Sequence, residues 1–128
     1  ERLLSEVDEN ILKICFDTGH HSFAGFDPVK FMKKYMSRIS YMHFKDINPK
    51  VKQNVIENRT GFYDACGQGI FCNLGDGDVD FSTVRKILLE NSFEGWCTVE
   101  QDCDPLLDPN PLSDAKLNRE YLEAIGFS

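Results

Sequence analysis

The chain has 128 residues, of which 41% are hydrophobic and 12% are aromatic, a composition typical of a single globular domain. Its 14 Lys and Arg against 21 Asp and Glu give a formal net charge of −7. A surface this acidic repels phosphate backbones and anionic lipids, so nucleic acid and membrane are excluded as expected partners. No apolar run approaches the roughly 20 residues that a membrane-spanning helix needs.

The first part of the chain is predicted to alternate between helices and strands. Residues 1–7 carry the start of an apolar helical pattern, and the apolar run 11–16 is predicted to be a strand. A helix is expected to follow Asp27, which can cap it with Pro28 at the first helical position. Residues 39–44 form a second apolar run between polar segments, which favours a second strand.

The second part of the chain continues this alternation after a long insertion. Residues 50–69 are interpreted as a connection that is partly helical, and 70–74 as a short strand or an ordered loop. Asp80 is predicted to cap a helix whose buried side carries Phe81, Val84, Ile87 and Leu88. A third strand is expected at 96–100, and a last helix from about 114, with Leu117, Tyr121, Leu122 and Ile125 on its apolar face.

This order of elements predicts an α/β fold with a parallel sheet and crossover helices. The strands are short and alternate only weakly, as parallel strands covered on both faces do. A complete eightfold (β/α) barrel takes about 250 residues, so residues 1–128 could supply only about half of one. If the sheet belongs to such a barrel and not to a doubly wound fold, the chain is a partial (β/α)8 TIM barrel.

The five cysteines are odd in number and include no Cys-x-x-Cys pair, so they match no zinc or disulfide pattern. We interpret them as reduced thiols of a cytoplasmic protein. Two of them, Cys15 and Cys97, lie within apolar runs and are expected to be buried.

Groups that can bind a metal or move protons follow each predicted strand. Asp17 ends the first, His43 and Lys45 end the second, and Glu100 ends the third. The active sites of parallel α/β folds lie at this edge of the sheet. Alternation along the strands places these side chains on common faces, where an imidazole and two carboxylates can converge. Such a donor set suits Mn²⁺, Co²⁺, Mg²⁺ or Zn²⁺.

Each of these residues also has a structural interpretation. The Asp-Thr-Gly sequence from Asp17 could be only a turn, since Asp and Gly are common turn residues. His43 could be a core histidine, and Glu100 could pair with a nearby lysine. The coincidence of all three at strand ends favours the metal-site hypothesis.

Four segments together resemble the xylose-isomerase-like barrel superfamily of sugar isomerases and epimerases. They are 17–20 (Asp-Thr-Gly-His), 43–46 (His-Phe-Lys-Asp), 75–81 (Gly-Asp-Gly-Asp-Val-Asp-Phe) and 99–102 (Val-Glu-Gln-Asp). The resemblance covers nearly the whole chain and identifies it as the C-terminal portion of such a barrel, without the N-terminal half. The continuation 102–105 (Asp-Cys-Asp-Pro) narrows the resemblance to members that dehydrate a cyclic polyol ketone.

The resemblance implies a role for each matching residue. Asp17, His43 and Glu100 are expected to bind a divalent metal, Mn²⁺ or Co²⁺ before Mg²⁺ or Zn²⁺. Glu100, His20 and Lys45 are expected to be catalytic, and His20, Lys45 and Asp46 to bind the substrate. The family's remaining glutamate ligand is expected upstream of residue 1, so we expect the isolated chain to be inactive.

The implied activity is elimination of water from 2-keto-myo-inositol, a cyclic polyol ketone. Two alternatives remain open: a metal-dependent ketose isomerase or epimerase with the same ligands, and a non-catalytic fragment that acts as a binding module. Because a half-barrel exposes strand edges, we also expect a homo-oligomer or dependence on the missing half of the barrel.

Overall fold

The computed structural model describes residues 1–103, 106 and 110–127, so Asp104 and Pro105 of the 102–105 continuation lie outside the described residues. The elements in chain order are α1 (Arg2–Glu6), β1 (Ile14–Asp17), α2 (Thr18–Phe23), α3 (Pro28–Tyr35), the 3-10 helix η1 (Met36–Arg38), β2 (Ile39–Phe44), β3 (Asp46–Ile47), α4 (Pro49–Asn58), α5 (Phe62–Gly67), β4 (Phe71–Cys72), α6 (Phe81–Glu90), β5 (Trp96–Val99) and α7 (Pro111–Ala124). Within this part of the chain, no helix is both long and apolar enough to cross a membrane.

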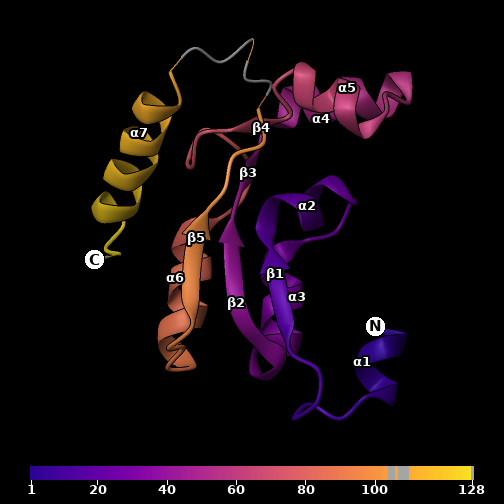
Figure 1. Ribbon diagram of the computed structural model, residues 1–128, viewed down its shortest axis with the longest axis vertical. Helices are drawn as coiled ribbons and strands as arrows, with labels where there is room; N and C mark the ends of the chain where they lie inside the picture. Colours follow the sequence, from indigo (N-terminus) through magenta and orange to yellow (C-terminus); the bar gives the residue numbers. More distant parts are fainter. Residues whose placement is uncertain (104–105, 107–109, 128) are drawn as a thin grey trace.

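The central feature is a parallel sheet with the strand order β1-β2-β5 (Figure 1). Asp17 of β1 is in register with His43 of β2, and His43 in turn with Thr98 of β5. The three predicted strands and their parallel arrangement are thus confirmed. Among the described residues the sheet does not close, which agrees with a partial barrel.

The strand bounds agree with the prediction for β2 and differ at the ends of its neighbours. β1 begins at Ile14, three residues later than expected, because the Ile11 and Leu12 amides donate to the Asp8 carbonyl and form a turn. β5 ends at Val99, yet the Glu100 amide still donates to the Phe44 carbonyl at 3.0 Å. Strand pairing therefore continues as far as Glu100.

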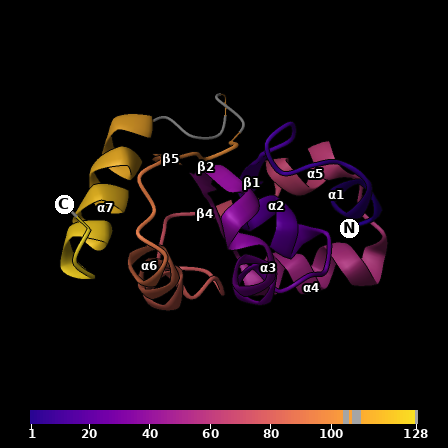
Figure 2. The ribbon, with the colours of Figure 1, turned by 90° about the horizontal axis from the view of Figure 1, so that it is seen from below.

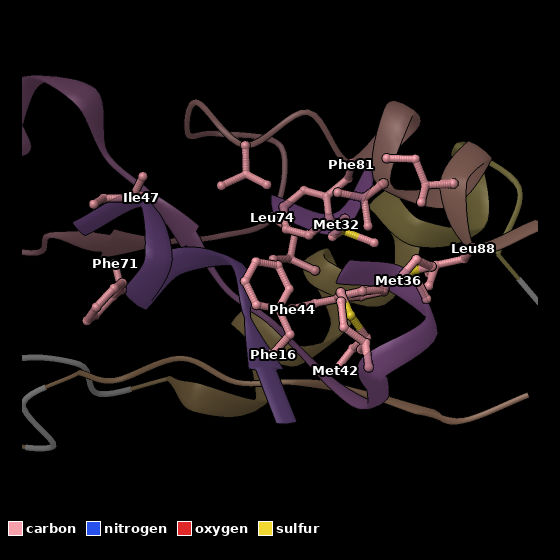
Figure 3. Close-up of a cluster of buried hydrophobic side chains, with 14 of the residues drawn as sticks. Phe16, Met32, Met36, Met42, Phe44, Ile47, Phe71, Leu74, Phe81 and Leu88 are labelled. Carbon is pink, nitrogen blue, oxygen red and sulfur yellow. The ribbon is translucent and has the colours of Figure 1, made fainter. Parts of the chain in front are cut away.

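One face of the sheet is covered by α3 and α6, which lie together on the same side of it (Figure 2). Phe16, Met42 and Phe44 point to this side and are buried (Figure 3). The opposite face carries Cys15 and Trp96, both exposed. The prediction of cover on both faces, and with it the prediction that Cys15 is buried, is therefore wrong for the described residues.

The two covering helices begin where the sequence predicted. The Asp27 carboxylate accepts a hydrogen bond from the Lys30 amide at 3.1 Å and caps α3, whose first residue is Pro28. The Asp80 carboxylate accepts one from the Thr83 amide at 2.9 Å and caps α6. The predicted buried side of α6 is confirmed in full, namely Phe81, Val84, Ile87 and Leu88.

The last helix differs from the prediction in its start and in one inward residue. α7 begins at Pro111, three residues early, and Leu117 is exposed. The inward position belongs to Asn118, which is 2% exposed. Its side chain accepts from the Leu74 amide at 2.7 Å and donates to Gln101 at 3.1 Å. A hydrogen-bonded polar residue therefore ties α7 to the segment that follows β4.

The long insertion forms two helices and one strand. Residues 49–58 and 62–67 are α4 and α5, so most of the predicted connection is helical. β4 pairs antiparallel with β3, with Phe71 opposite Ile47. This small sheet follows β2 directly and lies above the carboxyl edge of the main sheet (Figure 1).

Asp46 anchors the loop between β4 and α6. Its carboxylate is fully buried and accepts hydrogen bonds from four backbone amides at 2.9–3.1 Å: those of Ile47, Gly75, Gly77 and Val79. Burial raises the pKa of Asp46, and these four bonds act in the opposite direction. The prediction that Asp46 binds substrate is wrong for this structure, because the backbone of the loop occupies its oxygens.

We expect Asp46→Asn to lower the free energy of unfolding by about 2–4 kcal/mol, because the amide NH₂ would face backbone donors and leave some of them unsatisfied. Urea denaturation followed by circular dichroism measures the change. Asp76→Asn, at an exposed position of the same loop, is the control and should stay within about 0.5 kcal/mol of the parent. Equal stability of the two variants would contradict the anchoring role.

Candidate active site and metal-ligand cluster

The carboxyl edge of the main sheet gathers the ionisable side chains that follow its three strands. Asp17 is the last residue of β1, and His43 is its neighbour in register on β2. The hydrogen bond that the Glu100 amide donates to the Phe44 carbonyl holds Glu100 at the same edge. Parallel pairing, in which strand ends meet at one edge, thus brings together residues that are far apart in sequence.

The side chains of Asp17, His43 and Glu100 each direct one possible ligand atom toward a common space. His43 Nδ1 lies 3.6 Å from Asp17 Oδ2 and 3.2 Å from Glu100 Oε2. All three atoms lie within 4.8 Å of one another, as in a group that could hold a metal ion. The predicted convergence of Asp17, His43 and Glu100 is confirmed as geometry.

The environment of these atoms fits a divalent cation. Asp17 Oδ1 accepts from the His20 amide at 2.7 Å and caps α2, whereas Asp17 Oδ2 is buried without a hydrogen-bond partner. Its nearest cationic group is the Lys45 ammonium at 3.3 Å, and a metal ion would supply the direct partner that this oxygen lacks. His43 Nε2 lies 3.7 Å from Cys15 Sγ, so Nδ1 is the ring nitrogen turned to the carboxylates. One nitrogen and two oxygens form the donor set that Mn²⁺, Co²⁺, Mg²⁺ and Zn²⁺ accept.

Lys45 places a positive charge beside this group. Its side chain is 1% exposed, and Nζ lies 2.8 Å from Glu100 Oε2, 2.7 Å from Asp102 Oδ2 and 3.3 Å from Asp17 Oδ2. Nζ is also 2.8 Å from His20 Nε2. The structural alternative for Glu100, pairing with a lysine, is therefore confirmed together with the convergence.

The ion pair between Lys45 and Glu100 favours the charged form of each side chain. Burial acts to lower the pKa of Lys45, but its hydrogen bonds to Asp102 and Glu100 outweigh burial, so the pKa is raised. The hydrogen bond from Lys45 lowers the pKa of Glu100 in turn. Lys45 is consequently an ammonium at neutral pH, suited to stabilising negative charge and poorly suited to releasing a proton.

The lysine stem is enclosed by the start of α2. Thr18 Oγ1 donates to the Lys45 carbonyl at 2.7 Å and accepts from the Lys45 amide at 3.0 Å, so it replaces strand pairing where β1 turns into the helix. A Cβ on Gly19 would lie 2.6 Å from Lys45 Cγ, so only glycine leaves room for the stem. The Phe71 ring lies 4.9 Å from Nζ, within cation–π range.

His20 is the more accessible partner of this charge cluster. Its side chain is 42% exposed, and Nε2 lies 3.3 Å from Asp102 Oδ2. Phe62 and Phe71 hold the ring from two sides, with centroids at 5.6 and 5.2 Å. The neighbouring His21 packs against Phe16 and Phe31 instead. The structure therefore places His20 where a bound molecule could reach it.

Asp102 is a site residue that the sequence pattern placed on one face with Glu100 but to which it gave no role. Thr98, Glu100 and Asp102 alternate along one face of β5 and its extension, as the sequence predicts, but this period does not show that Asp102 meets Lys45. His20, Glu100 and Asp102 form a second group of possible ligand atoms within 4.8 Å of one another. In this structure the Lys45 ammonium provides the cation for that group.

Two hollows flank the sheet. One, of about 700 Å³, runs along the outer edge of β1 and reaches Asp17 and His20. The other, of about 950 Å³, lies between α6, β5 and α7 and is lined by apolar side chains such as Leu88 and Trp96. Only the first reaches the ionisable cluster, so it is the hollow relevant to the site.

Comparison with known proteins gives a consistent set of relatives. The xylose isomerase-like TIM barrel family matches residues 1–125. An inosose dehydratase of Clostridium botulinum (strain Eklund 17B / Type B) is 40% identical over 123 residues, which are 96% of this chain and 41% of the relative. Inosose dehydratases of Clostridium beijerinckii and Bacillus cereus are both 38% identical, covering 99% and 96% of this chain and 43% and 41% of their own. The chain thus spans about two fifths of the length of these relatives.

We expect Gly19→Ala to lower the free energy of unfolding by about 1–3 kcal/mol, because the added methyl overlaps the Cβ and Cγ of Lys45, which cannot move freely. Gly67→Ala in α5 is the matched control, since a Cβ there meets nothing within 4 Å, and it should be neutral or slightly stabilising. Chemical denaturation of both variants provides the measurement. A neutral Gly19→Ala would show that the Lys45 stem is not confined as described.

Proposed function

Because the chain belongs to the xylose isomerase-like TIM barrel family, we propose that it is the C-terminal portion of a metal-dependent hydro-lyase. The proposed reaction is elimination of water from 2-keto-myo-inositol, in inositol catabolism. The observation that carries the proposal is the convergence of Asp17 Oδ2, His43 Nδ1 and Glu100 Oε2 at the carboxyl edge of the sheet. The name inosose dehydratase, shared by the relatives reported above, supports a dehydratase over other activities of the family.

Asp17, His43 and Glu100 would hold the metal, with Mn²⁺ or Co²⁺ as the proposed ion. Asp17 Oδ2, which is buried and accepts no hydrogen bond, and the orientation of His43 Nδ1 support this assignment. A divalent cation bound there would supply Lewis-acid polarisation of the substrate ketone. A further ligand from outside this chain, a glutamate in the resemblance described above, would complete the site.

Glu100, which is also a proposed metal ligand, and His20 divide the proton transfers of a β-elimination. Glu100, whose pKa is lowered, is the proposed base for the proton next to the carbonyl. His20, whose side chain is 42% exposed, is the proposed acid that protonates the leaving hydroxyl. The C–H and C–O bonds break, a C=C bond forms, water leaves, and the resulting enol rearranges to a dione. Lys45 stays charged and stabilises negative charge that develops on oxygen.

The runner-up function is a ketose isomerase or epimerase built on the same ligands. That reaction returns the proton to carbon and releases no water, so it needs no acid for a leaving group. The placement of His20 beside Asp102 favours elimination, because it provides such an acid. A non-catalytic binding module is the third possibility, and activity of the full-length protein would exclude it.

The assembly follows from the open edges of the sheet. Within the described residues, β1 and β5 each pair with β2 alone. Unpaired edges favour association, so we propose pairing with the rest of a barrel or with a second copy. Cys15, Cys66, Cys72 and Cys97 form no disulfide, which agrees with the proposed cytoplasmic location.

We predict that this chain binds Mn²⁺ weakly and that Asp17→Asn weakens the binding at least tenfold further. Asparagine preserves the cap of α2 but removes the ligand charge. Asp27→Asn, the equivalent cap of α3, is the matched control and should bind Mn²⁺ like the parent. Titration followed by the electron spin resonance of free Mn²⁺ gives both affinities. Equal affinity of all three proteins would remove Asp17 from the site.

We also predict that the full-length protein converts 2-keto-myo-inositol to a dione in the presence of Mn²⁺ and leaves free ketoses unchanged. Ultraviolet absorbance of the conjugated product follows the elimination, and proton NMR detects any epimer. His20→Gln should reduce turnover at least about a hundredfold if it is the general acid. Epimer formation without a dione would establish the runner-up function.

A further inference from the structure

The ammonium of Lys45 and the proposed metal require the same two oxygens. Nζ lies 2.8 Å from Glu100 Oε2 and 3.3 Å from Asp17 Oδ2, and both of these atoms belong to the proposed ligand set. Two cations that share both oxygens repel each other at short range, where the interaction is only weakly screened. A third group must therefore hold the ammonium if the metal is to bind.

Asp102 is that third group. Its Oδ2 makes the shortest contact with Nζ, 2.7 Å, and lies on the side where His20 also contacts the ammonium. The Asp17–His43–Glu100 ligand group does not include Asp102, so a metal in this group leaves the Asp102 carboxylate available to Lys45, whereas a metal in the His20–Glu100–Asp102 group would not.

The charges of the cluster support the same assignment. Asp17, Glu100 and Asp102 contribute three negative charges, and Lys45 contributes one positive charge. A divalent cation would bring the cluster to neutrality. Without the Asp102 charge, the Lys45 ammonium would have only the ligand carboxylates Asp17 and Glu100 as ion-pair partners, so it would compete with the divalent cation for both.

We propose that Asp102 is a positioning residue that holds the Lys45 ammonium, so that Asp17 and Glu100 stay available to a divalent cation. This inference rests on the proposed function, because it assumes the metal site. It assigns a role to Asp102 that acts through Lys45 and not through contact with the metal.

A double-mutant cycle on this chain tests the proposal with Mn²⁺ alone as the probe. Asp102→Asn should raise the dissociation constant about tenfold to a hundredfold, the range typical of residues that support metal ligands. Lys45→Met should lower it, because the competing charge is gone. Asp102→Asn in the Lys45→Met background should change it by no more than about threefold, since Asp102 then has no ammonium to hold.

The matched control is Asp78→Asn, which makes the same chemical change at another carboxylate. The Asp78 side chain is 40% exposed, against 41% for Asp102, and it also pairs with a lysine, Lys52, at 3.8 Å. It should leave Mn²⁺ affinity within about twofold of the parent. Circular dichroism checks that each variant folds, and Lys45→Gln replaces Lys45→Met if the methionine variant does not.

An equal loss of affinity on Asp102→Asn in both backgrounds would overturn the proposal, because Asp102 would then act through its own charge or as a ligand. Unchanged affinity of Asp102→Asn, with clear binding by the parent, would overturn it while leaving the proposed function intact. Absence of Mn²⁺ binding in both the parent and Lys45→Met would instead reject the metal site itself.

Discussion

The buried ammonium of Lys45 is the charge on which the carboxyl edge of the sheet depends. Three carboxylates approach it within 3.3 Å, and without a cation among them they would repel one another. Burying a lysine costs free energy unless its ammonium is paired with an opposite charge and hydrogen-bonded. Lys45 Nζ forms both ion pairs and hydrogen bonds with the carboxylates around it. The absence of a side chain at Gly19 and the double hydrogen bond of Thr18 hold the stem in place, so the position of the charge is determined by the backbone around it.

Neighbouring residues of one strand end serve two different parts of the fold. Lys45 points to the side of the sheet that carries His43, whereas Asp46 points the opposite way and binds the backbone of the loop 75–79. Alternation along an extended chain makes this division possible. The loop that Asp46 organises precedes α6, a helix that covers the apolar face. One dipeptide therefore connects the candidate site to the packing behind it.

The two faces of the sheet differ in chemistry because only one of them is covered. The covered face carries aromatic and methionine side chains that pack against α3 and α6. The open face carries Tyr41, His43 and Thr98, whose polar groups need no apolar cover. In the family to which the chain belongs, a barrel interior is the expected location of such a face, and the cluster of possible ligands lies at its carboxyl end.

The sequence by itself determined the local structure, because caps, apolar periods and strand ends are written within a few residues of one another. It placed α3 and α6 at their caps, identified three parallel strands, and selected Asp17, His43 and Glu100. Only the tertiary structure decided that Asp102 joins the cluster, that Asp46 leaves it, and that Asn118 takes the inward position on α7. Alternation shows which side chains share a face. It does not show which face is covered, or that an ammonium meets a carboxylate 57 residues further along the chain.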